Sequence, residues 1–109
     1  MPRADSLQGA LDLLVLTILS RKGPLHGYAI ITAIEEISEG VLRAEEGSLY
    51  PALRRMEDSG WLRGTWITRD VGRRARVYAV TAAGQKQLAA EESRWHLGAA
   101  AVKRVLRMA

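Results

Sequence analysis

Residues 61–81 read WLRGTWITRDVGRRARVYAVT, and this stretch predicts a β-hairpin. Residues 61–68 are rich in aromatic and β-branched side chains, and residues 74–81 alternate between two faces, as strands do. The intervening residues 70–73 (DVGR) have the composition of a hairpin tip. The segments on both sides have helical periodicity, so the hairpin marks the point at which the chain changes from helix to strand.

A first helix is predicted from Ser6, as its N-cap, to about Ser20. It ends at residues 21–24 (RKGP), where basic residues precede a glycine and a proline. Leu13 and Leu16 fall on a different face from the main apolar stripe, which contains Leu7, Leu11, Leu14, Val15, Ile18 and Leu19. A short helix that is apolar on more than one side must be covered on more than one side. In a chain this small, that requirement indicates a partner subunit.

Two further helices are predicted before the hairpin. The second begins near residues 26–28 (HGY) and ends at Gly40, and the third begins near Ser48 and ends at Gly60. The Ser48 hydroxyl can cap the third helix, and Pro51 is tolerable in its first turn. Helical spacing places one set of side chains toward the core (Leu49, Leu53, Met56) and another toward solvent or a ligand (Pro51, Arg54, Arg55).

The final predicted helix begins after Thr81, which can cap it, and ends near Met108. A seam with alternating spacings of four and three residues runs along it and contains Leu88, Glu92, Trp95, Ala99, Val102 and Leu106. Nothing that follows in the sequence can bury this seam. We therefore interpret residues 82–109 as a dimerisation helix and residues 1–81 as a separate domain.

The composition excludes several classes of protein. The chain has 109 residues, 48% of them hydrophobic and 26% charged, which suits one globular domain. It contains no cysteine and only two histidines, His26 and His96, so thiol chemistry, a metal site, a cofactor and a catalytic relay are not expected. The longest apolar run falls short of the ~20 residues that cross a bilayer, and the start does not resemble a secretory signal. We expect a soluble, cytoplasmic protein that is not an enzyme.

The positive charge is concentrated in one stretch. Seven arginines and three acids fall within residues 54–76, whereas the rest of the chain holds nine basic and nine acidic residues. The net charge of +4 therefore belongs to this stretch alone. A solvated surface usually mixes its signs, so the arrangement favours a site for a polyanion. Chance clustering on a solvated face is the alternative.

Three helices, a hairpin and a long helix, in that order, are typical of a winged helix-turn-helix protein, which is α+β and mostly helical. In that fold the third helix enters the major groove of DNA, and the hairpin, or wing, reaches along the backbone or into the minor groove. The arginine-rich stretch covers the third helix and the wing, so two independent observations indicate double-stranded DNA as the partner. A winged-helix module that binds proteins instead is the alternative function.

The sequence resembles the PadR family of bacterial transcriptional regulators in three motifs. They are HGYxI at residues 26–30, GSLYPxLxRMExxG at residues 47–60, and a motif at residues 72–84 that contains Gly72-Arg73 and then RxYxVTxxG from Arg76. Met56 and Val80 stand where the family more often has Leu, and neither lies on the predicted DNA surface. The single terminal helix resembles the short branch of the family. The resemblance implies homodimers that bind palindromic operators, mostly as repressors, and that in many members release DNA when a small aromatic molecule binds.

The predicted DNA contacts are His26, Tyr28, Ser48, Tyr50, Pro51, Arg54, Arg55, Arg73, Arg74 and Arg76. Arg54 can read guanine, or it can pair with Asp58 one helical turn later. Arg55 can meet phosphate, or it can pair with Glu57 or Asp58 on a solvated face. His26 stands near a helix start, where a phosphate contact and a structural hydrogen bond are equally compatible with the sequence.

Other members of this set also have structural alternatives. Arg73 and Arg74 flank the wing tip, where phosphate or the minor groove is the expected partner. Arg76 can contact DNA or stack on Trp66 across the hairpin. Tyr50 can contact DNA or pack its ring against the second helix and leave its hydroxyl outside.

Trp95 has two interpretations. It can fill a dimer interface formed by Leu7, Leu11, Leu14, Leu88, Trp95, Ala99, Val102 and Leu106. Alternatively, Trp95 and Ala99 can line a cavity between subunits, in which two copies of the tryptophan sandwich a flat aromatic effector. The sequence does not distinguish the two.

Overall fold

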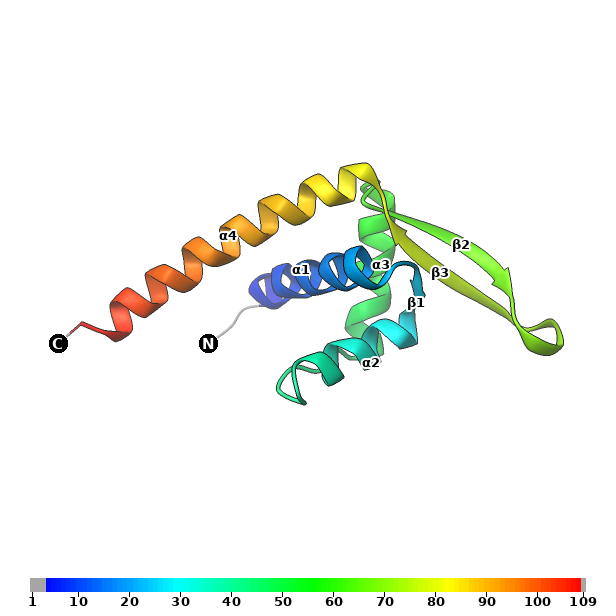
Figure 1. Cartoon of the computed structure of the whole chain (residues 1–109), viewed down its shortest axis with the longest axis horizontal. Helices are drawn as coiled ribbons and strands as arrows, with labels where there is room; N and C mark the ends of the chain where they lie inside the picture. The colour runs from blue at the N-terminus through cyan, green and yellow to red at the C-terminus, as the bar shows by residue number, and fades with distance from the viewer. Residues whose placement is uncertain (1–3, 109) are drawn as a thin grey trace.

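The computed structural model describes residues 4–108, and the side chains of residues 10–108. Four α-helices and a three-stranded antiparallel sheet make up this part of the chain (Figure 1). The elements are α1 (Ala4–Lys22), β1 (Leu25–His26), α2 (Gly27–Ile37), α3 (Glu46–Asp58), β2 (Leu62–Thr68), β3 (Arg74–Val80) and α4 (Ala82–Leu106). Within these residues, no helix is both long and apolar enough to cross a membrane.

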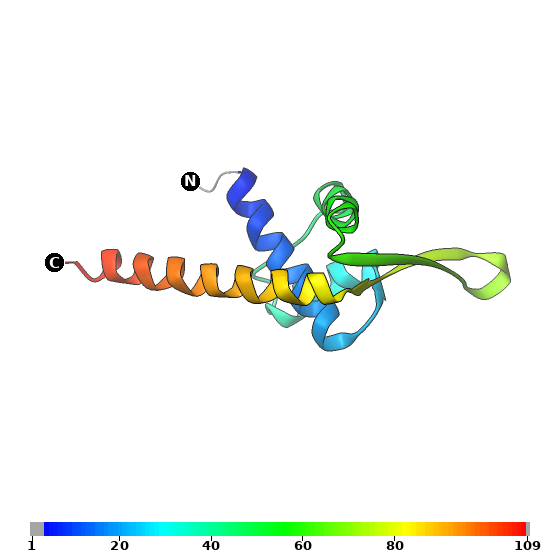
Figure 2. The same cartoon turned by 90° about the horizontal axis from the view of Figure 1, so that it is seen from above.

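The molecule is elongated, with principal extents of 62 × 29 × 23 Å. Helices α1, α2 and α3 form a body, from which the hairpin projects at one end and α4 at the other (Figures 1 and 2). The first half of α4 lies along α1, and the remainder extends past the body. The hairpin and the end of α4 are therefore available to contact other molecules.

Helix α1 runs through the centre of the body. Its Val15 and Leu16 are completely buried, together with Ile30 of α2 and with side chains of α3. Helices α2, α3 and α4 and strand β3 all pack against α1, so the chain itself covers more than one side of this helix. The prediction that this helix must be covered on more than one side is correct, but other elements of the same chain provide much of that cover. The predicted core residues of α3 are confirmed, because Leu49, Leu53 and Met56 are all fully buried.

The hairpin forms as predicted, and a short strand joins it. Strands β2 and β3 pair from Leu62 with Val80 to Thr68 with Arg74. Strand β1, which no sequence pattern indicated, pairs Leu25 with Tyr78 on the other edge of β3. This pairing attaches the base of the wing to the connection between α1 and α2.

Of the three N-caps predicted from the sequence, one is confirmed and two are wrong. Thr81 caps α4, because its hydroxyl accepts the backbone N–H of Gly84. Ser6 lies inside α1 and is not its N-cap. Helix α3 begins at Glu46, so Ser48 is not its cap and Pro51 lies inside the helix rather than in its first turn. The acidic Glu46 in the first turn interacts favourably with the positive end of the helix dipole. This interaction stabilises the start of the helix without a serine cap.

The wing tip contains a strained residue. Val71 has φ +56° and is 99% exposed, and Gly72 follows with φ +73°. The left-handed region is unfavourable for a β-branched side chain, at a cost of about 1–3 kcal/mol. Packing against the rest of the described chain does not offset this cost, because the Val71 side chain faces solvent.

Replacing Val71 with Asn is expected to raise the free energy of unfolding by about 1 kcal/mol, since Asn tolerates positive φ and the exposed valine contributes no packing. Urea denaturation measures the change. The matched control is Val41→Asn, at another exposed valine that does not have positive φ, and it should gain nothing. A midpoint for Val71→Asn at or below that of the wild type would show that the tip is not strained in solution.

Candidate nucleic-acid interface

The outer face of α3 presents polar and cationic groups. Ser48, Pro51 and Arg54 are exposed, while the opposite face of the helix is buried against α1 and α2. The Arg54 guanidinium therefore projects from the body, as helical periodicity predicts. A helix with one buried face and an exposed arginine on the other can be inserted into a groove without rearrangement.

Tyr50 packs against the start of α2. A Cβ added to Gly27 would lie 2.6 Å from Cε1 of the Tyr50 ring, so only glycine permits this approach. The tyrosine is nevertheless 42% exposed. The predicted packing of the ring on the second helix is therefore confirmed, but the hydroxyl oxygen also lies against Gly27, 2.7 Å from the same added Cβ, rather than wholly outside.

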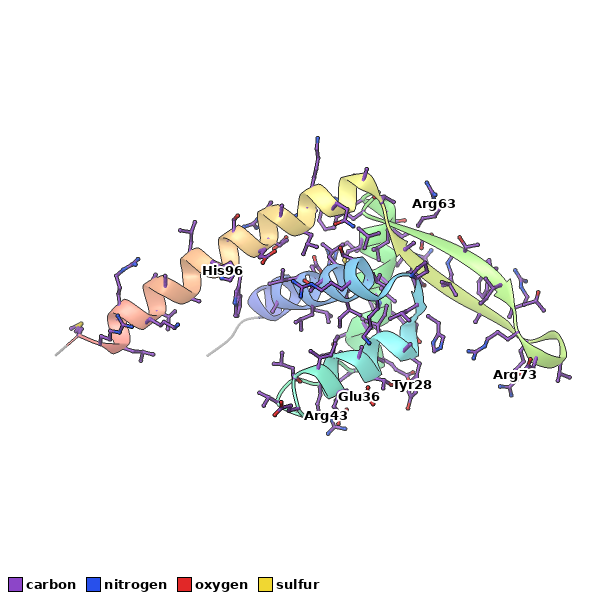
Figure 3. All side chains as sticks on the ribbon, in the orientation of Figure 1. Tyr28, Glu36, Arg43, Arg63, Arg73 and His96 are labelled. Atoms are coloured by element: carbon purple, nitrogen blue, oxygen red, sulfur yellow. The ribbon has the colours of Figure 1, made fainter. Side chains whose placement is uncertain are left out.

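His26 has a structural role at the start of α2. Its Nδ1 accepts a hydrogen bond from the backbone N–H of Ala29 at 3.2 Å, which satisfies one of the free donors of the helix. This arrangement fits the structural alternative predicted for His26. The neighbouring Tyr28 is exposed and points away from the body (Figure 3).

Two arginines of β3 lie over Trp66 of β2. The guanidinium carbons of Arg74 and Arg76 are 4.7 and 5.3 Å from the ring centre. Stacking of Arg76 on Trp66 is thus confirmed, and Arg74 shares the same ring. Arg76 also forms an ion pair with Glu57 of α3 at 2.5 Å, which ties the wing to that helix. Arg74 is more exposed than Arg76.

A concave surface connects α2, α3 and the wing. It has a volume of about 530 Å³ and is lined by aromatic rings and basic side chains: His26, Gly27, Tyr28, Tyr50, Trp66, Arg69, Ala75, Arg76 and Tyr78. A second hollow of about 460 Å³ lies at the wing tip, among Arg69, Arg73 and Arg74. Phenol hydroxyls and guanidinium groups are the donors that proteins use to contact sugar-phosphate backbone.

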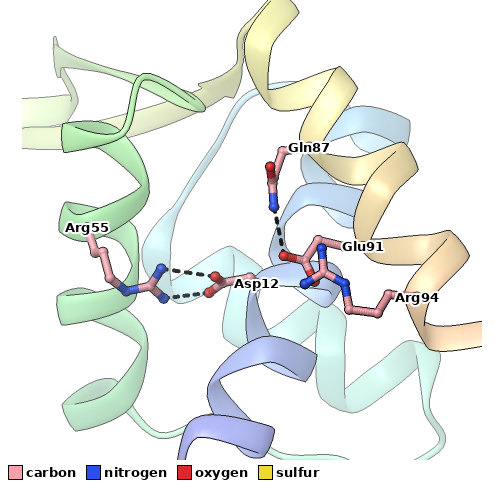
Figure 4. A network of polar contacts seen from close by, with 5 residues as sticks. All are labelled: Asp12, Arg55, Gln87, Glu91 and Arg94. Atoms are coloured by element: carbon pink, nitrogen blue, oxygen red, sulfur yellow. Dashed lines mark hydrogen bonds and ion pairs between the residues drawn. The ribbon is translucent and has the colours of Figure 1, made fainter. Parts of the chain in front are cut away.

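Arg55 does not belong to this outer face. Its two terminal nitrogens donate to both carboxylate oxygens of Asp12 in α1, at 3.0 and 2.6 Å (Figure 4). The hydrogen bond to Asp12 raises the pKa of Arg55 above its ordinary value. The prediction that Arg55 points away from the core is wrong, and its partner is neither Glu57 nor Asp58. An acid in the middle of the apolar stretch of α1 was the signal, because the 7% exposed Asp12 side chain requires a cationic partner.

The remaining arginines of residues 54–76 are exposed. Among the described residues, the ion pairs that the structure shows for this stretch are Arg55 with Asp12 and Arg76 with Glu57. Arg54, Arg63, Arg69, Arg73 and Arg74 all face solvent. Arg73 lies beside the turn of the wing, whereas Arg63 is at its base (Figure 3). Most of the excess positive charge is therefore on the surface of α3 and the wing.

Helix α4 buries only its first part. Leu88 packs against the core, Ala99 is half-buried, and Trp95 is 55% exposed. Val102 and Leu106, further along the predicted seam, are also exposed. Leu11 and Leu14 of α1 are half-buried, and Leu7 has a side chain outside the described residues.

An apolar groove of about 480 Å³ separates α4 from α1 and α2. It is lined by Leu13, Leu14, Thr17, Ile18, Arg21, Lys22, Ile34, Ile37, Ser38, Leu42, Leu88, Glu92, Trp95 and His96. The tryptophan therefore lies at an apolar concave surface, while Ala99 is not among its lining residues.

Comparison with known families gives one match that covers most of the chain. A model of the transcriptional regulator PadR-like family matches residues 15–90. An uncharacterised 37.1 kDa protein in a transposon of Streptomyces fradiae is 43% identical over 80 residues. This alignment covers 73% of the present chain and 21% of the relative, so the chain spans about a fifth of the relative's length.

Solved structures have the same fold. A transcriptional regulator from Clostridium thermocellum has a TM-score of 0.83 at 23% identity and covers 95% of this chain and 97% of its own. A PadR family transcriptional regulator from Eggerthella lenta has a TM-score of 0.80 at 29% identity, with coverage of 94% and 88%. The predicted winged helix-turn-helix fold with a C-terminal helix is confirmed.

Alkaline pH is expected to weaken the junction between wing and body. Burial raises the pKa of Tyr78, and the nearby charge of Arg76 only partly offsets it. Above pH ~10 the unfolded chain loses this proton while the folded chain keeps it, so stability falls as pH rises. Tyr78→Phe should make the fall shallower between about pH 9 and about pH 11 in denaturation experiments.

The matched control for this experiment is Tyr28→Phe, which removes the phenol of an exposed tyrosine. It should follow the wild-type pH profile. Identical profiles for Tyr78→Phe and the wild type would show that the raised pKa of Tyr78 does not cause the loss of stability at alkaline pH.

Proposed function

The chain belongs to the transcriptional regulator PadR-like family, and we propose that this DNA-binding regulator acts as a homodimeric repressor on palindromic operators. The observation that carries the proposal is the exposed arginine surface shared by α3 and the wing. Five arginines of that surface face solvent, while the two that pair with carboxylates hold the elements in place. A regulator of this kind meets its DNA in the cytoplasm.

Helix α3 enters the major groove in the proposed complex. Arg54 reads a guanine through two hydrogen bonds, which contributes about 1–3 kcal/mol of discrimination. Ser48 and Tyr50 of α3, and Tyr28 at the start of α2, donate to phosphates. Pro51, also exposed, offers only apolar contact.

The wing follows the DNA backbone beside the reading helix. Arg73 and Arg74 contact phosphates or the minor groove, and Arg69 lies in the same hollow. The Trp66 ring orients Arg74 in advance, which reduces the entropy lost on binding. Arg76 is assigned a supporting role, because Glu57 already neutralises it. His26 is assigned the same kind of role as the cap of α2.

A homodimer would cover the exposed seam of α4. Trp95, Val102 and Leu106 leave apolar surface in water, which a second copy of the same helix can bury. Two α3 helices related by twofold symmetry would reach half-sites about 10 base pairs apart, or a multiple of that distance. The predicted contacts Leu7, Leu11, Leu14, Leu88 and Ala99 belong to this proposed interface.

An aromatic effector is the proposed ligand of the same region. Trp95 lies on the apolar groove between α1, α2 and α4, and a second Trp95 across the dimer axis would complete a sandwich around a planar molecule. A ligand held there would change the angle between the two α4 helices and so the separation of the two α3 helices. Ala99 would leave space for the ligand.

Arg54→Ala and Arg73→Ala are each expected to weaken binding to an operator fragment selected from genomic DNA. For Arg73→Ala, the slope of log affinity against log salt should decrease by about 0.9 for each phosphate that the variant no longer neutralises. Arg54→Ala should instead reduce the preference for the selected fragment over unrelated DNA, because it removes a base contact. Fluorescence anisotropy at increasing salt concentrations measures both quantities. The control Lys103→Ala removes an equal charge from the distal part of α4 and should preserve affinity and slope. Salt-independent binding in the wild type would favour the protein-interaction module.

Val102→Glu is expected to convert a dimer into a monomer, because it places a charge in the proposed interface. The isolated chain should stay folded, since Val102 is exposed within it. Sedimentation velocity measures the oligomeric state, with Lys103→Glu on the adjacent position as the control for an added carboxylate. A monomeric wild type at micromolar concentration would refute the dimer.

A further inference from the structure

Arg54 and Arg55 are adjacent on α3 and point in different directions. Arg54 is exposed, whereas Arg55 turns toward α1 and donates two hydrogen bonds to Asp12. Fork-to-fork pairing of this kind fixes the relative orientation of two side chains, because guanidinium and carboxylate are both planar. The pair therefore constrains how α3 lies against α1, rather than only how far apart the helices are.

A second acid, Glu91 of α4, also affects Arg55. The charge of Glu91 in α4 raises the pKa of Arg55, in addition to the larger effect of Asp12. Glu91 is itself held in place, because Gln87 donates a hydrogen bond to it at 2.8 Å and Arg94 forms an ion pair with it at 4.0 Å. Its side chain is only 14% exposed. Figure 4 shows these residues between α1, α3 and α4.

This cluster, Asp12, Arg55 and Glu91, differs from an isolated buried ion pair. It contains one cation on the proposed reading helix and one acid on each of two other helices. One of those helices, α4, carries the exposed seam and lines the apolar groove.

We propose that Arg55 is a positioning residue that sets the pose of α3 for DNA through its two hydrogen bonds to Asp12. The inference rests on the proposed function, because it requires α3 to be the DNA-reading helix. It predicts that the cluster affects DNA affinity although none of its members touches DNA. The opposite possibility is that Arg55 leaves Asp12 and binds phosphate in the complex.

Asp12→Asn distinguishes these two possibilities by the sign of its effect. If Arg55 is a positioning residue, losing the carboxylate disorders the pose of α3, and affinity for the selected operator fragment falls about fivefold. If Arg55 binds phosphate, removing its competitor raises affinity. The matched control is Asp58→Asn, which makes the same charge change at an exposed acid of α3 and should not lower affinity. Circular dichroism gives the folded fraction, to which all affinities are corrected.

Arg55→Lys provides a second readout. Lysine keeps the charge but lacks the planar fork, so a phosphate contact would survive the change and a fixed pose would not. We expect a loss of affinity with an unchanged salt slope, whereas Arg73→Ala should reduce the slope. Full affinity in Arg55→Lys, or a loss of stability alone with normal affinity of the folded protein, overturns the positioning role.

Sedimentation velocity checks that the variants keep the wild-type oligomeric state. Failure of the wild type to bind any genomic fragment would instead overturn the proposed function, and with it this inference.

Discussion

Two ion pairs connect α3 and the wing to the elements beside them. Asp12 binds Arg55 and fixes α3 to α1, and Glu57 binds Arg76 and fixes the wing to α3. Because each pair is partly shielded from water, its loss would cost more than that of an exposed pair. The other arginines of the stretch are exposed, and their charge is available to a polyanion. Arginine side chains thus form the ion pairs within the molecule and also provide the exposed positive charge.

Helix α4 links the two ends of the molecule. Its first turns join the body through the Thr81 cap and Leu88, and its distal half carries exposed Trp95 and Val102. Glu91 lies between these parts, and its side chain is largely buried. In the proposed dimer, the angle of α4 would set the spacing of the two DNA-reading surfaces.

Periodic patterns and the Thr81 cap were predictable from the sequence. The spacing of Leu49, Leu53 and Met56 identified the buried face of α3, and alternation identified the hairpin with Arg76 opposite Trp66. Features that depend on contacts between distant segments were not predictable in this way. The pairing of β1 involves two residues, too few for a pattern, and the partner of Asp12 lies in another helix. Arg55 was placed on the outer face from helical spacing alone. Spacing within one helix does not show that a buried acid of another helix needs a cationic partner.

The central claim is that α3 and the wing grip successive turns of one DNA duplex, presented twice by a symmetric dimer. Hydroxyl-radical footprinting on a fragment selected from genomic DNA tests it most directly. We predict two symmetric sets of protected sugars, centred about 10 base pairs apart or a multiple of that distance. Protection of a single half-site, or none at concentrations where the protein is folded and dimeric, would contradict it.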